Sequence, residues 1–270
     1  MARKQSCTEG RFLKDAAAHQ MEVLRDEGVN RHLRFKNPES SAYWFDIITW
    51  PGTLCIDGDM GTFVFRRLHD MFVFFRTDQE HYDRTGRADK LAINPSYWGE
   101  KLRAPAPRDA QEFCADSFRQ HVQEAFDSWK QSNQPDDDEW TTDADRRQFE
   151  EQRDALWAAL KEDVMSYADD GRIRAYDAAR DFRCDEVPGF NLEDCWEWDC
   201  RVFKFDFLWN CYAISWGIKT YDAAKQPAQA ATNTKPASGL FLSQPQARQK
   251  HGCLPHASEG VAPEIGAGGG

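Results

Sequence analysis

The sequence lacks a long apolar run and an apolar leader. Its most apolar window, residues 202–218, contains Lys204, Asp206 and Asn210, and such side chains are costly near the centre of a bilayer. The first residues, MARKQSCTEG, are not followed by an apolar stretch, so we expect neither a secretory signal nor a membrane span. These observations predict a soluble protein of the cytoplasm.

The chain also lacks the short motifs of the common enzyme classes. It contains no G-x-S-x-G elbow, no P-loop and no G-x-G-x-x-G fingerprint, which removes the usual signature of acyl hydrolases, nucleotide triphosphatases and dinucleotide enzymes. None of its seven histidines stands beside an obvious nucleophile. We therefore favour a role without catalysis and expect no cofactor.

Positive charge is in deficit. Lys and Arg number 34 against 45 Asp and Glu, giving a net charge of −11, which disfavours binding to phosphates and to anionic membranes. Residues 133–170 contain 13 acidic and 4 basic residues, a balance of −9. This segment is either a solvated helix face or a docking surface for a basic protein partner. The candidate contact residues are Asp136, Asp137, Asp138, Glu139, Glu150 and Glu151.

Two alternative sites come from the first part of the chain. Basic residues close to aromatic ones could form a nucleic-acid surface, although acidic residues interleave with them over residues 66–90. The other alternative is a metal-assisted enzyme, with a divalent metal bound by Asp57 and Asp59, which flank Gly58; the same residues are also those that a tight hairpin turn requires. The basic candidates are Arg31, Arg34, Lys36, Arg66 and Arg67.

The remaining candidate site residues are eight cysteines and a dense group of tryptophans. Without an export signal the cysteines are expected to be reduced thiols, and the spacers between Cys184, Cys195, Cys200 and Cys211 do not resemble the two close pairs of a structural zinc site. The tryptophans predict core packing, with an interface as the alternative. They are Trp196, Trp198, Trp209 and Trp216.

The residue pattern predicts an α+β fold that begins with a helix over residues 7–27, with Ser6 and Glu9 at capping-box spacing. Short strands over 31–36, 42–50, 53–56 and 62–67, joined by tight turns, predict an antiparallel meander of three to four strands. Both faces of the second strand are apolar, so we expect helices to cover at least part of each face. One face carries Tyr43, Phe45 and Ile47, and the other carries Trp44, Ile48 and Trp50.

The rest of the chain is expected to be mostly helical and to pack on the sheet. Asp70 is a candidate cap for a helix that starts with Met71, and residues 78–108 are expected to be mostly loop around Tyr97 and Trp98. Helices are predicted over 108–131, 143–167 and 172–182, and a buried aromatic helix within 192–225. The composition predicts one α+β domain over residues 1–225 and a disordered tail over 226–270.

Three runs of the chain resemble a family of uncharacterised proteins encoded by temperate phages and bacterial prophages. They are RHLRFK at 31–36, YWFDIITWPG at 43–52 and GDMGTFVF at 58–65, and residues 196–221 resemble the family's C-terminal helix. The resemblance covers most of residues 10–225. It implies an accessory phage role in the bacterial cytoplasm and supplies no activity or site residue. Together with the acidic segment it predicts binding to a host or phage protein, in an anti-defence or regulatory role.

Overall fold

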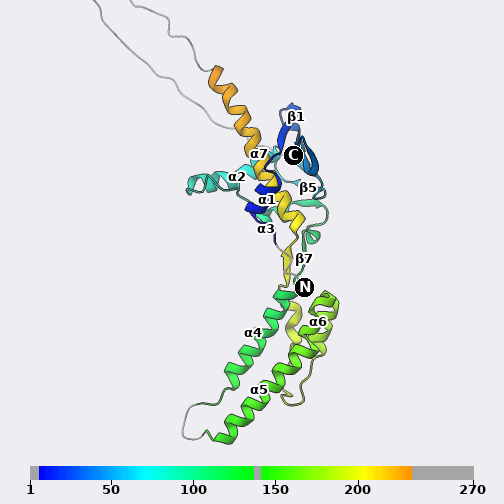
Figure 1. The fold of residues 1–270 in the computed structure, drawn as a ribbon, viewed down its shortest axis with the longest axis vertical. Coiled ribbons are helices and arrows are strands. Elements are labelled where there is room, and N and C mark those ends of the chain that lie inside the picture. The colour runs from blue at the N-terminus through cyan, green and yellow to red at the C-terminus, as the bar shows by residue number, and fades with distance from the viewer. Residues whose placement is uncertain (1–5, 137–140, 233–270) are drawn as a thin grey trace, which may run out of the picture. The chain divides into compact units, whose positions relative to one another are not determined.

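The computed structural model describes residues 6–136 and 141–232, and it has the predicted α+β fold (Figure 1). Helix α1 (Glu9–Asp15) precedes a six-stranded sheet, and helices dominate the chain after the sheet. Residues up to Pro227 form one compact unit. The chain from Ala228 onward forms a second unit, in which only the end of helix α7 (Phe205–Thr232) is described.

The prediction of one helix over residues 7–27 is wrong beyond Asp15, because Gln20–Glu27 forms strand β1. The cap is Thr8 rather than Ser6: the Thr8 hydroxyl accepts a hydrogen bond from the Arg11 amide at 3.3 Å. Gly28 has a φ of +62°, a backbone conformation that glycine adopts readily. It lies in the turn between β1 and β2 (Asn30–Asn37) and does not end a helix.

The central sheet is an antiparallel meander in the order β1-β2-β3-β4-β5-β6. The predicted meander over 31–67 is confirmed as its centre, formed by β2, β3 (Ser40–Trp50), β4 (Thr53–Gly58) and β5 (Phe63–Arg66). The edge strands β1 and β6 (Leu102–Ala104) were not foreseen. Residue 102 falls in the segment expected to be loop.

One face of the sheet is covered by helices and forms the main core. Alternate strand residues such as Leu33, Phe35 and Ile47 are fully buried there against α1, α2 (Met71–Arg84), α3 (Pro95–Gly99) and α7. A Cβ added at Gly217 of α7 would lie 2.6 Å from the Ile47 Cδ1 atom, so the glycine allows the helix to approach the strands closely.

The opposite face carries Trp44, Ile48 and Trp50, and these residues belong to neither hydrophobic core of the described chain. Trp50 is 43% exposed. The expectation that helices cover part of both faces is therefore wrong within the described residues.

A second hydrophobic core, made of other residues than the sheet core, lies within a group of helices. We call this part the helical lobe, made of α4 (Ala115–Asn133), α5 (Asp143–Asp163), α6 (Arg172–Asp181) and the 3-10 turns η2 (Met165–Asp170) and η3 (Glu193–Glu197). Its buried residues include Phe118, Phe126, Leu156 and Leu160. The chain enters it through β7 (Gln111–Phe113) and leaves through β8 (Arg201–Phe203), which pair antiparallel.

Several helices begin or end at other residues than predicted. Residues 107–110 form a short 3-10 turn, η1 (Pro107–Ala110), and β7 follows, so α4 begins only after its cap Cys114. The predicted helix over 143–167 ends at Asp163 and continues as η2. Helix α2 extends to Arg84 into the expected loop, and α7 begins at Phe205 after β8. Helix α7 also runs past the predicted tail boundary to Thr232, and residues 233–270 lie outside the described chain.

Candidate functional site

The exposed face of α5 is the first candidate site. A capping box between Thr142 and Asp145 fixes the start of the helix, and Trp157 packs on Phe126 of α4 with ring centroids 4.7 Å apart. This contact turns the acidic residues of α5 toward solvent. Among the described residues, no ion pair involves the exposed carboxylates of Asp143, Glu150, Glu151, Glu162 and Asp163.

The predicted acidic contact residues therefore divide into two groups. Glu150 and Glu151 are exposed on α5, and Asp136 is exposed just after α4. Asp137, Asp138 and Glu139 lie outside the described residues.

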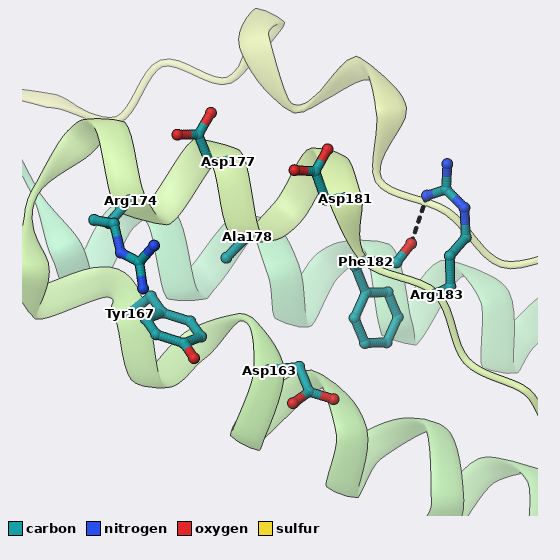
Figure 2. Close-up of a pocket in the computed structure, with 8 residues that line it drawn as sticks. All are labelled: Asp163, Tyr167, Arg174, Asp177, Ala178, Asp181, Phe182 and Arg183. Atoms are coloured by element: carbon teal, nitrogen blue, oxygen red, sulfur yellow. Dashed lines mark hydrogen bonds between the residues drawn. The ribbon is translucent and has the colours of Figure 1, made fainter.

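A hollow of about 420 Å³ adjoins the end of α5 (Figure 2). Tyr167 of η2 and Phe182, just after α6, supply its aromatic surface. The Arg174 guanidinium lies over the Tyr167 ring at 4.9 Å, and Arg183 donates a hydrogen bond to the Phe182 carbonyl oxygen at 2.6 Å. The full lining is Asp163, Tyr167, Arg174, Asp177, Ala178, Asp181, Phe182 and Arg183.

The three carboxylates of the hollow are not equivalent. Arg180 binds Asp181 at 2.8 Å and Asp177 at 3.2 Å, and the hydrogen bond from Arg180 lowers the pKa of Asp181 below its ordinary value. Asp163 has no ion-pair partner in the described part of the chain. It is therefore the lining carboxylate that remains available to an incoming cation.

The hollow has the chemistry of a binding site. None of its eight lining residues is a serine, cysteine or histidine. Aromatic rings beside a carboxylate suit a guanidinium or ammonium group. The sequence reading missed this site. Residues 174, 178 and 181 do recur at helical spacing, but the hollow forms only where η2 packs against α6.

The basic candidates are not gathered into one surface. Arg31 lies on the core side, 8% exposed, and both of its terminal nitrogens bind Asp70 at 2.9 Å. Arg34 lies on the opposite face and binds Asp46 through two hydrogen bonds of 2.9 Å. The remaining three, Lys36, Arg66 and Arg67, are exposed. Two of the five cations are thus already paired with carboxylates.

Asp57 and Asp59 both serve the turn that they flank. Asp57 accepts a hydrogen bond from the Thr62 hydroxyl, and Asp59 accepts one from the Tyr43 amide at 2.6 Å. A Cβ at Gly58 would come within 2.2 Å of the Trp44 carbonyl oxygen, so the turn requires glycine there. Among residues 6–136 and 141–232, no group of three His, Cys, Asp or Glu side chains could hold a metal ion.

The cysteines and tryptophans also divide between core and surface. Seven cysteines of the described chain are free thiols, and burial raises the pKa of Cys7 to about 12, which leaves its thiolate scarce at neutral pH. Cys253 lies outside the described residues. Trp209 is fully buried, whereas Trp196 of η3 is 63% exposed on the helical lobe.

Comparisons with known proteins identify no relative: no family model, no curated protein and no solved structure matches this chain. None of the helices in the described residues is both long and apolar enough to cross a membrane.

Proposed function

We propose that this protein acts by binding another protein, and that the acidic face of α5 is the surface that receives it. The observation that carries the proposal is the group of exposed carboxylates without ion-pair partners on one helix, beside a hollow. Helix α5 carries seven acidic residues against four basic ones, and such an excess of one sign attracts and orients a partner of the opposite sign. The partner surface is therefore basic.

The hollow supplies the specific contact of this proposal. A lysine or arginine side chain of the partner enters beside Tyr167 and Phe182 and reaches Asp163. Arg174 and Arg183 are already engaged with the Tyr167 ring and the Phe182 carbonyl group. Trp196, on the same lobe, offers an exposed aromatic group of the kind that dominates many interfaces.

The biological setting is proposed from the resemblance to prophage-encoded proteins. In that setting the protein is an accessory factor of a temperate phage in the bacterial cytoplasm. Its partner is a host or phage protein, and the complex has an anti-defence or regulatory role. Nothing in the hollow requires a cofactor or a reaction for this role.

The test compares capture of partners by two variants of equal charge change. Full-length E150K/E151K reverses two of the unpaired carboxylates on α5, and full-length E39K/E80K reverses two exposed carboxylates elsewhere. Quantitative mass spectrometry then measures what each protein recovers from a bacterial lysate.

We expect the wild type and E39K/E80K to recover the same basic partner at low salt, and E150K/E151K to bind it roughly tenfold more weakly. Raising the salt to about 0.5 M should release the partner, because exposed charges are then screened. Equal recovery by all three proteins, or a partner that salt does not release, would contradict the proposal.

A further inference from the structure

The uncovered face of the sheet carries apolar residues, of which Trp50 is exposed and the others are half-buried. Ile48 of β3 is opposite Cys55 of β4, and Cys55 is opposite Val64 of β5. Trp50 extends this apolar row along β3, and Trp44 lies on the same face beyond the row of Asp46. An antiparallel sheet with one solvated face normally alternates apolar and polar residues, so a cluster of apolar residues on the open face indicates an interaction surface.

Two rows of this face also carry charged residues of both signs. Arg34 of β2 is opposite Asp46, which is opposite Asp57 of β4, so a basic and an acidic residue lie on either side of β3 in one row. In the next charged row, Trp50 of β3 is opposite Thr53 of β4, and Thr53 is opposite Arg66 of β5. Glu27 of β1 is paired with Asn30, which precedes the Arg31 opposite Thr49, so Glu27 lies near this row on the other side of β3, where Arg25 of its own strand forms an exposed ion pair with it at 2.6 Å.

This arrangement is self-complementary under a two-fold rotation about an axis parallel to β3. The rotation places β2 over β4 of a second copy and β1 over its β5, with the rows retained. Arg34 then faces Asp57 of the second copy, and Arg66 faces its Glu27. The apolar residues of β3 face their own counterparts, as in an isologous interface.

Asp46 lies close to such an axis and would face Asp46 of the second chain. Its charge is compensated within the chain, because Arg34 binds it through two hydrogen bonds and the His32 Nε2 atom lies 2.8 Å from its carboxylate. Only 5% of Asp46 is exposed. Two copies of this group can therefore approach without leaving a carboxylate unpaired.

We propose that the open face binds a second copy of the chain and forms a two-fold sheet-on-sheet dimer, with strands aligned within about 30°. A polyanion is a poorer occupant, because it would meet Asp57 and Glu27 as well as the arginines. The proposal concerns a surface other than α5 and does not depend on the proposed function.

The size of the face sets the expected strength. Five strands about 4.8 Å apart, each about five residues long, cover roughly 400 Å² of sheet. Standard interfaces bury about 800 Å² of accessible surface on each partner. We therefore expect a reversible dimer with a dissociation constant in the micromolar range.

The test measures the mass of the full-length protein by sedimentation velocity from roughly 1 to 100 µM. The wild type should pass from monomer to dimer over this range. I48D should remain monomeric with an unchanged far-UV circular dichroism spectrum. The control I173D, which changes an isoleucine that is 74% exposed on α6, should still dimerise.

A charge exchange identifies the second copy as the occupant. R66E and E27R should each weaken self-association about tenfold. The double variant R66E/E27R should restore it, and an equimolar mixture of the two single variants should form the mixed dimer. A wild type that stays monomeric at every concentration, a dimer unaffected by I48D, or a double variant no better than the single ones would overturn the proposal.

Discussion

The pair formed by Arg31 and Asp70 gives the sharpest test of the sheet core. Asp70 accepts two hydrogen bonds of 2.9 Å from the Arg31 guanidinium and a third of 2.9 Å from the Phe72 amide, which it caps at the start of α2. The Arg31 guanidinium also lies 4.5 Å from the centre of the Phe72 ring. One carboxylate thus caps a helix and neutralises a buried cation.

The two roles of Asp70 separate by substitution. Asp70→Asn keeps a good helix cap but removes the charge, and leaving a buried cation without its partner costs about 3 kcal/mol of unfolding free energy. Asp70→Ala also removes the cap, which adds about 1 kcal/mol, for a total of about 4 kcal/mol. Arg31→Met removes the buried charge itself and should cost about 1 kcal/mol or less.

The expected order of stability is therefore wild type, R31M, D70N and D70A. Urea unfolding followed by far-UV circular dichroism measures it, and the double variant R31M/D70N should be close to R31M because the charge that D70N strands is then absent. A D70N protein as stable as the wild type, or an R31M protein as unstable as D70N, would refute this account of the pair.

Acid titration gives an independent check of the same pair. Burial raises the pKa of Asp70, but hydrogen bonds from Arg31 and the Phe72 amide lower it by a larger amount. The pKa in the folded state therefore lies below its ordinary value. The unfolded state then binds more protons as the pH falls through about 4. The stability difference between wild type and D70N should be constant above about pH 5 and shrink below about pH 4.

Two further predictions address the helix packing and the turn. G217V should destabilise the protein by about 1–3 kcal/mol in urea unfolding, because the added atoms meet Ile47 and Phe35; a variant as stable as the wild type would show that α7 can move away from the sheet. Calcium or magnesium at about 1 mM should leave the melting temperature unchanged, since Asp57 and Asp59 bind Thr62 and Tyr43. A rise that D57N abolishes would restore the metal interpretation.

The predictable parts of the fold are those with strong local signals. The strands around Phe45 are dense in aromatic and β-branched residues and are separated by Pro51, Gly52 and Gly58, which is sufficient to predict a meander. Asp70 was identified as a cap from its position before an aromatic run, and the structure confirms it. Helix α6 was also located closely.

The missed elements depend on contacts between distant residues. The segment of β1 contains Met21 and Leu24, whose spacing fits a helix, but its partner strand β2 makes it an edge strand with a bulge after Val23. Strand β6 has three residues and is held by β5, far away in the sequence. The hollow forms between η2 and α6, so no single segment contains its signal.

Strand β3 carries apolar residues on both of its faces. Its two apolar faces predicted helices on both sides, which is correct reasoning for a strand buried within one chain. Within residues 6–136 and 141–232, the helices that pack on the sheet lie on the face of Phe45 and Ile47. The tryptophans and Ile48 of the other face still gain free energy by leaving water, and the flanking charges match a second copy of the same face. The sequence pattern thus records burial on both faces, and we infer that another chain completes it.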